Sequence, residues 1–171
     1  MSGQLNLKPV ALMSAVNSSE MRISQDPCET LVAFSIGSGI ALSIHDSGSM
    51  IGGILNFLLP DSAFAGRSAI AKNPFMYADS GIPAFLATLC DQGAILNQMK
   101  VVVAGAAQIV GQTGFYNIGD QNYKAVQKIL SEHKLQIQHA HVGGTNTRTL
   151  ILNIGDGFNT IKILGEGEIN I

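Results

Sequence analysis

Residues 31–62 read LVAFSIGSGIALSIHDSGSMIGGILNFLLPDS, and this stretch decides the fold. It contains three short apolar runs of β-branched and small residues, which predict strands over Leu31–Ile36, Ile40–His45 and Met50–Leu58. Asp46-Ser47-Gly48-Ser49 separates the second run from the third and is typical of a hairpin turn. The stretch therefore predicts three consecutive strands, the last two joined as a hairpin.

Apolar residues at helical spacing predict a helix after a long loop over residues 60–74. This helix is expected to start near Asp79 or Ser80, to hold Pro83 in its first turn and to end at Gly93.

A second helix is predicted from about Ile118 to His133, with Asn117 as its N-cap. Further strands are predicted over Met99–Ala104, 135–142, 149–154 and 159–164. About eight strands, with two helices grouped mid-chain, do not follow a regular βαβ alternation. The sequence therefore predicts an α+β fold.

The composition limits the classes of function. The chain has 171 residues, which suits one domain, and only 13% of them are charged, against about 25% in typical globular proteins. A net charge of −2 and the lack of a basic stripe give no reason to expect nucleic-acid binding. No apolar run approaches the roughly 20 residues that span a membrane, and the N-terminus lacks a signal-peptide pattern. We expect a cytoplasmic protein without membrane insertion.

Four sequence blocks resemble, in order and spacing, those of the chemoreceptor glutamine deamidase family (CheD). They are residues 31–62, NPFMYADSGIP at 73–83, FYNIGDQN at 115–122, and Val142-Gly143-Gly144. The resemblance covers roughly residues 20–164. It implies a three-layer sandwich, in which two helices pack on a β-sandwich of mixed or antiparallel strands. We expect residues 20–171 to form this single domain and residues 1–19 to be a flexible N-terminal extension.

The resemblance also locates the family's chemistry. Hydrolysis of a glutamine side-chain amide needs a nucleophile stronger than water, which a cysteine thiolate with a neighbouring histidine supplies. The family's cysteine, histidine and threonine align with Gly39, Asn56 and Ala33. Glycine has no side chain, asparagine does not exchange a proton near neutral pH, and alanine cannot hydrogen-bond through its side chain. No catalytic residue of the family is intact.

Other departures from the family lie near these blocks. Ser35-Ile36 stands where the family usually has Gly-Leu, and Ala140-His141 stands where it commonly has Glu-Asp. The segment Val103–Ala107 stands where it usually has Phe-Gly-Gly-Ala.

A relocated nucleophile is the alternative to a silent protein. Cys28 has no histidine near it in sequence, and the adjacent Glu29 disfavours its thiolate. Ser38 needs an adjacent base, and Asn56 is not one. Cys90 falls on the apolar face of the first helix, which predicts a buried, inert thiol.

The histidines and glycines suggest structure more than chemistry. His139 and His141 alternate along a predicted strand with no carboxylate or cysteine close in sequence, so a hydrogen-bonded pair is expected instead of a metal site. His45 ends a strand and is expected to be structural. The glycines lack phosphate-loop spacing, so neither a nucleotide nor another cofactor is expected.

These patterns predict a CheD-like protein of chemotaxis that acts by binding; the alternative is an active glutamine deamidase or hydrolase with a relocated nucleophile. The resemblance implies two partners, a chemoreceptor (methyl-accepting chemotaxis protein) and a CheC-type phosphatase. The expected contact surface consists of Ser38, Gly39, Asn56, Phe57 and Tyr77.

Overall fold

The strands form two five-stranded sheets in a computed structural model that describes residues 12–63, 72–108 and 117–171. The first sheet has the spatial order β1 (Leu12–Ala15), β3 (Glu29–Ile36), β8 (Arg148–Asn153), β9 (Asn159–Ile163) and β10 (Gly167–Asn170). The second has the order β2 (Glu20–Ser24), β5 (Ile51–Phe57), β4 (Ile40–Asp46), β6 (Met99–Gly105) and β7 (His139–Val142). The pairs β1–β3 and β6–β7 are parallel, and the other pairs are antiparallel.

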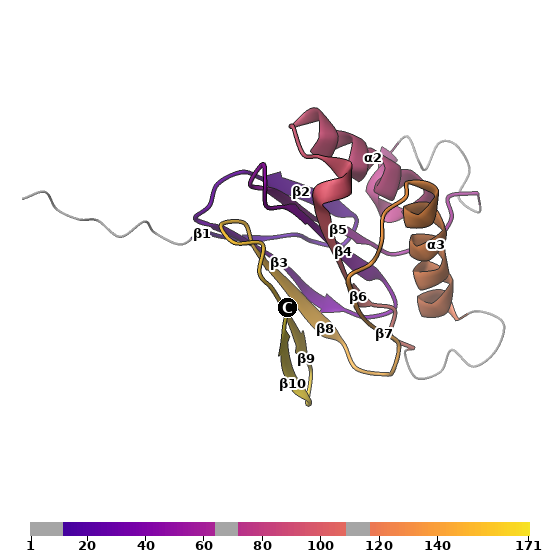
Figure 1. Cartoon of the computed structure of the whole chain (residues 1–171). Coiled ribbons are helices and arrows are strands. Elements are labelled where there is room, and N and C mark those ends of the chain that lie inside the picture. Colours follow the sequence, from indigo (N-terminus) through magenta and orange to yellow (C-terminus); the bar gives the residue numbers. More distant parts are fainter. Residues whose placement is uncertain (1–11, 64–71, 109–116) are drawn as a thin grey trace, which may run out of the picture.

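Two helices, α2 (Ala78–Asp91) and α3 (Ile118–Glu132), cover one face of the second sheet, and the first sheet covers the other (Figure 1). Short 3-10 turns precede α2 and β6, at η1 (Pro74–Met76) and η2 (Leu96–Gln98). The three-layer α+β sandwich is confirmed.

Strand alternation builds the two cores between these layers. Ile40, Leu42 and Ile44 of β4 are fully buried against the helices. The alternate residue Ala41 joins a second cluster between the sheets, with Leu150 of β8 among its members. A residue's parity along a strand therefore decides which of the two cores it enters.

The predicted hairpin is confirmed, because β4 and β5 pair in antiparallel register from Ile40↔Phe57 to Asp46↔Ile51. The N-cap of α3 is also confirmed, since the Asn117 side chain accepts a hydrogen bond from the Asp120 amide at 3.1 Å.

Two expectations about α2 were wrong. The helix begins at Ala78, so Pro83 lies in its interior and not in its first turn. Cys90 is exposed, although we expected it to be buried. It lies eight residues after Ile82, which at 3.6 residues per turn places it about 80° around the helix, beyond the buried face.

The N-terminal segment is more ordered than the sequence suggested. Leu12–Ala15 forms β1, so a flexible extension over residues 1–19 does not describe this part. Residues 1–11 lie outside the described residues. The strands β2 and β10 were not predicted either. Within the three described ranges, no helix has the length and apolar content needed to cross a membrane.

Candidate functional site

The positions of the family's histidine and threonine lie between the two sheets. Ala33 of β3 is fully buried in the core cluster there, and Asn56 of β5 is 4% exposed. Asn56 donates a hydrogen bond to the Val16 carbonyl at 3.2 Å, and the Val16 amide donates to the Val32 carbonyl at 2.8 Å. The side chain of Asn56 therefore fixes the segment after β1 and does not face a substrate.

Gly39, at the family's cysteine position, lies just before β4 and beside the end of β5. A Cβ atom built on Gly39 would stand 2.6 Å from the Phe57 carbonyl oxygen and 3.3 Å from a Leu58 methyl carbon. Real Cβ atoms essentially never approach another atom within 3.0 Å. This backbone therefore has no room for a cysteine unless the end of β5 moves.

The loops around Gly39 are held by hydrogen bonds between segments that are far apart in sequence. Asn122 of α3 is fully buried and donates to the Ser38 carbonyl at 2.8 Å and to the Leu58 carbonyl at 2.9 Å. The amides of Ala106 and Ala107 donate to the carbonyls of Gly39 and Gly37 at 2.8 and 2.9 Å.

The family's Leu-Pro-Asp-Ser and Tyr-Ala-Asp segments are joined in the same way. The Ser62 amide and hydroxyl donate to one carboxylate oxygen of Asp79 at 3.1 and 2.6 Å. The Ala78 amide donates to the Leu59 carbonyl at 2.8 Å. We use the name loop frame for residues 37–39, 58–62, 76–79, 105–107 and Asn122.

The expected contact surface is largely closed. Phe57 is fully buried, and Tyr77 and Asn56 are each 4% exposed, so a partner does not reach these side chains in this structure. Ser38 remains half-buried and accessible, whereas Gly39 is buried. The structure brings the five residues to one end of the sandwich, but of these five only Ser38 lies at its surface.

Neither alternative nucleophile has a base. Cys28 is half-buried, and its amide donates to the Asp26 carboxylate at 2.9 Å. Across the described part of the chain, no hydrogen bond joins Cys28 or Ser38 to a histidine. General-base activation requires heavy atoms within about 2.6–3.2 Å, or somewhat more without substrate, and this contact is missing.

The histidines are used in structural contacts. His45 is buried, and its Nε2 donates to the Ile154 carbonyl at 2.9 Å. His133 bonds through Nδ1 to the Ile129 carbonyl at 2.9 Å. Over the described ranges, no group of three or more His, Cys, Asp or Glu side chains is placed to hold a metal ion.

Sequence reasoning missed one buried charge, Arg148, at the start of β8. Its Nε donates to Nδ1 of His141 at 3.0 Å. Burial, and then the positive charge of Arg148, lower the pKa of His141. Arg148, Leu150 and Leu152 are two residues apart along β8 and therefore share one face of the strand. This period-two spacing was a signal that Arg148 points inward.

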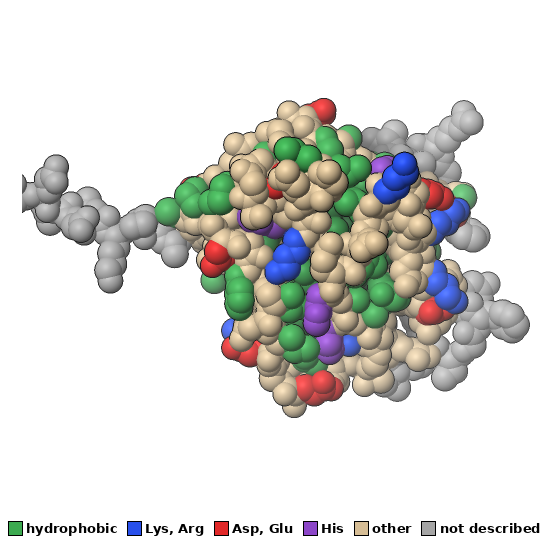
Figure 2. All heavy atoms as spheres, viewed as in Figure 1, with side chains coloured by type: hydrophobic (Ala, Val, Ile, Leu, Met, Phe, Trp, Pro, Cys, Tyr) green, Lys and Arg blue, Asp and Glu red, His purple; other side chains and the backbone are tan. Residues whose placement is uncertain are grey.

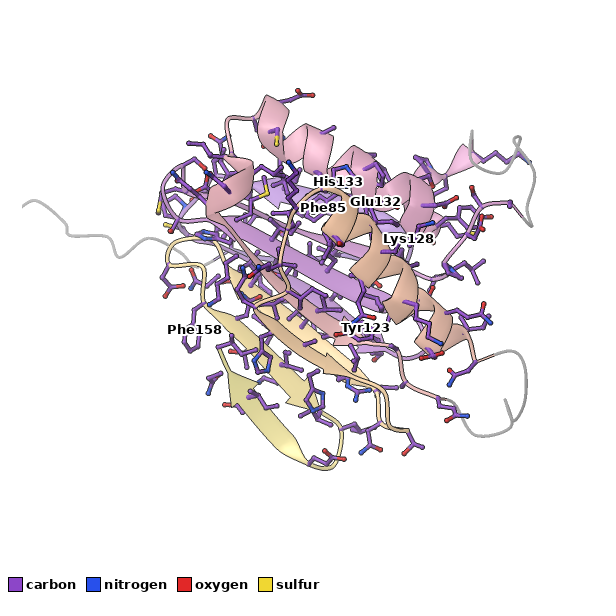
Figure 3. The ribbon with its side chains drawn as sticks, turned by 45° about the vertical axis from the view of Figure 1, so that its right-hand side comes forward. Phe85, Tyr123, Lys128, Glu132, His133 and Phe158 are labelled. Atoms are coloured by element: carbon purple, nitrogen blue, oxygen red, sulfur yellow. The ribbon has the colours of Figure 1, made fainter. Side chains whose placement is uncertain are left out.

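A groove of about 480 Å³ lies between α2 and α3 and was also missed. Pro83, Ala125 and Ile129 are among its lining residues. Figure 3 labels Lys128, Glu132 and His133 on the side of α3 beside α2, and they line the groove as well. No serine, threonine or cysteine is among the described residues that line it. The described lining of the groove therefore offers no hydroxyl or thiol nucleophile of serine, threonine or cysteine.

Charges are sparse over the surface that Figure 2 shows, where blue and red side chains are scattered among neutral and green ones. This agrees with the low charged fraction of 13%. Depletion of charged residues is a feature of the buried cores of protein–protein interfaces.

Residues 58–163 match the model of a family described as CheD chemotactic sensory transduction. The chain belongs to the CheD family. The matched span starts at residue 58 and so leaves out Ala33, Gly39 and Asn56, which the sequence resemblance aligns with the family's threonine, cysteine and histidine.

Curated relatives agree with this assignment. "Probable chemoreceptor glutamine deamidase CheD" of Solibacter usitatus (strain Ellin6076) is 37% identical over 145 residues, which are 83% of either chain. The protein of the same name from Symbiobacterium thermophilum is 33% identical over 159 residues, 91% of this chain and 95% of the relative. "Probable chemoreceptor glutamine deamidase CheD 1" of Syntrophus aciditrophicus (strain SB) is 34% identical over 150 residues, 88% of this chain and 93% of the relative. A chemotaxis-related CheD-like role follows.

Proposed function

We propose that this protein is a catalytically silent CheD that acts in chemotaxis by binding a partner protein. The observation that carries the proposal is the state of Gly39, which has neither a side chain nor the room for one. Covalent catalysis of amide hydrolysis is lost without its nucleophile. Asn56 cannot replace a histidine base, and its amide is already used to hold Val16.

The steric state of Gly39 also bears on restoring activity. Gly39→Cys alone lacks a base, and its thiol, with a free pKa of about 8.5, stays mostly protonated at neutral pH. Adding Asn56→His and Ala33→Thr supplies the missing groups. The new Cβ still meets the Phe57 carbonyl at 2.6 Å, so we expect the triple variant to remain inactive unless the end of β5 shifts.

The names of the relatives support a chemoreceptor as one partner, because they describe those proteins as chemoreceptor glutamine deamidases. The family resemblance supports a CheC-type phosphatase as the other. The accessible part of the expected contact surface is Ser38. The groove between α2 and α3 adjoins the loop frame at Asp61 and Asp79, which line it.

The test is capture of purified partners. The unmodified protein, Ser38→Arg and the distant control Ser131→Arg are immobilised and offered a chemoreceptor cytoplasmic fragment or a CheC-type phosphatase. Ser131 is exposed near the end of α3, nine residues after Asn122. Gly39 is left unchanged, because any side chain there would disturb the fold.

We expect the unmodified protein and Ser131→Arg to capture at least one partner, and Ser38→Arg to lose it while keeping a native circular dichroism spectrum. Failure of the unmodified protein to capture either partner would overturn the binding proposal. Equal capture by Ser38→Arg would show that the partner does not bind through the surface at Ser38.

A further inference from the structure

Arg148 is a charged side chain in the interior. It is the first residue of β8, is 4% exposed and shares its strand face with Leu150 and Leu152, which are fully buried between the sheets. Burial of a guanidinium is costly unless its hydrogen bonds and charge are satisfied. Its partners therefore decide whether this end of the sandwich is stable.

Those partners are neutral. Arg148 Nε donates to His141 Nδ1 at 3.0 Å, and Nη1 donates to the Asn146 carbonyl at 2.7 Å. Among the described residues, no carboxylate lies within 4.0 Å of the guanidinium. Glu166, which accepts a hydrogen bond from the Asn146 side chain, acts on Arg148 only from a longer range.

The direction of the hydrogen bond fixes the state of His141. A guanidinium only donates, so Nδ1 must accept, and the imidazole is neutral with its proton on Nε2. A proton on Nδ1 would remove the acceptor and place two positive charges about 3 Å apart. The bond therefore exists only while His141 is uncharged.

The same bond joins the two sheets. His141 lies on β7, an edge strand of the second sheet that pairs only with β6. Arg148 lies on β8 of the first sheet. The charged and titratable groups that act on His141 are Arg148, Glu166 and the neighbouring His139.

We propose that His141 and Arg148 form a pH-sensitive clasp, which ties the edge strand β7 to β8 at neutral pH and opens when His141 takes up a proton. Ala140-His141 stands where the family commonly has an acidic pair. A carboxylate at 141 would stay charged over this pH range. Histidine at that position makes the contact titratable.

The sign of the pH effect follows from the pKa of His141, which burial first and Arg148 second hold below its ordinary value of 6.5. The unfolded chain then binds the proton more readily than the folded protein does. The contribution of the clasp to stability is present above about pH 6.5 and is lost as the pH falls through the lower folded pKa.

The experiment compares denaturant unfolding of the unmodified protein, His141→Gln and His141→Asp between pH 5 and pH 8. Glutamine accepts the Arg148 hydrogen bond without titrating, and aspartate keeps a negative charge. The folding equilibrium constant of the unmodified protein should fall relative to that of His141→Gln as the pH drops, by tenfold for each unit of lowered pKa. His141→Asp should follow His141→Gln, and His139→Gln should keep the pH dependence of the unmodified protein.

Two measurements on the unmodified protein do not depend on the variants. The His141 ring should titrate below its ordinary pKa by NMR. Amide hydrogens of β7 should exchange faster at pH 5 than at pH 7, after correction for intrinsic rates, and those of β9 should not. An ordinary His141 titration, or pH curves for His141→Gln that parallel those of the unmodified protein, would overturn the clasp.

Discussion

The hydrogen-bonded loop frame and the side-chain positions Ala33, Gly39 and Asn56 meet at Gly39, which belongs to both. They differ in the interactions that their polar groups make. In the loop frame, each segment satisfies the hydrogen bonds of another, as Asn122 does for Ser38 and Leu58. At the family positions, Ala33 and Gly39 offer no functional side chain, and the Asn56 amide is tied to Val16.

This difference separates the residues that the fold needs from those that only the family's chemistry would need. A catalytic side chain can be lost without unfolding the chain, whereas a residue such as Asn122 leaves two half-buried carbonyls without a donor when it is lost. Retention of the loop frame is therefore explained by folding, and it is not evidence for catalysis.

The largest loss of stability is expected when the central side chain of the loop frame is removed. Asn122→Ala leaves the Ser38 and Leu58 carbonyls unpaired, and we expect a loss of about 2–4 kcal/mol in the free energy of unfolding. Gln127→Ala, an exposed change on the same helix, should stay within about 0.5 kcal/mol. Urea denaturation measures both, and equal effects would show that the loop frame does not hold the site.

The second variant tests whether the loop frame leaves room for a side chain at Gly39, the position of the family's cysteine. Gly39→Ala forces a Cβ atom against the Phe57 carbonyl, and the expected loss is about 1–3 kcal/mol. Its neighbour Ser38→Ala should change stability little, since the Ser38 side chain makes no hydrogen bond to a described residue. Thermal melts compare the two, and a stable Gly39→Ala would show that room for a side chain remains.

The third prediction concerns the other end of β3. Glu29 accepts hydrogen bonds from Ser14 at 2.5 Å and Arg22 Nε at 2.9 Å, and so joins β1, β2 and β3. Burial alone would raise the pKa of Glu29, but hydrogen bonds from Ser14, Ser24 and Arg22, with the charge of Arg22, together hold it below 4.5. Its contribution is therefore present above about pH 4.5 and is lost as the pH falls through the lower folded pKa.

Glu29→Gln should cost about 1–2 kcal/mol at pH 7, and less below pH 4 because the unmodified carboxylate is then protonating. Melting curves at both pH values test this, with the exposed Glu168→Gln as a control. A cost that does not shrink in acid would assign the effect of Glu29 to packing instead of charge.

The smallest expected effect is a gain in stability, in the variant Ser35→Gly. Ser35 has a positive φ of 52°, and it occupies a position where the family usually has glycine. A non-glycine residue in this region is strained by about 1–2 kcal/mol, partly offset by the greater chain entropy of glycine. Ser35→Gly should stabilise by about 0.5–1 kcal/mol, and Ser38→Gly, without a positive φ, should not. Denaturant midpoints decide, and a loss in Ser35→Gly would contradict the strain.

Much of the fold could be predicted from the sequence. Short apolar runs bounded by turn signals predicted the strands of residues 31–58, and the N-cap chemistry of Asn117 predicted the start of α3. The sequence pattern did not predict features that depend on contacts between residues far apart in sequence. β1 exists because it pairs with β3, and Tyr77 is buried because the bridge between Leu59 and Tyr77 draws its segment against β5.

The candidate site was predictable only as a set of missing groups. The alignment of Gly39 and Asn56 with the family's cysteine and histidine predicts a loss of the family's chemistry, and this stays a prediction. It did not reveal that the backbone of Phe57 fills the space beside Gly39, or that His141 meets Arg148, because both contacts join strands far apart in sequence.

The most direct test of the central claim is a deamidation assay with the purified protein. A chemoreceptor fragment with its glutamines intact is incubated with the protein, and conversion to glutamate is followed by mass spectrometry against a blank without protein. We predict no conversion above the blank, because within residues 12–63, 72–108 and 117–171 no histidine is hydrogen-bonded to Cys28 or Ser38. Conversion by the unmodified protein that disappears in Cys28→Ala or Ser38→Ala would contradict it.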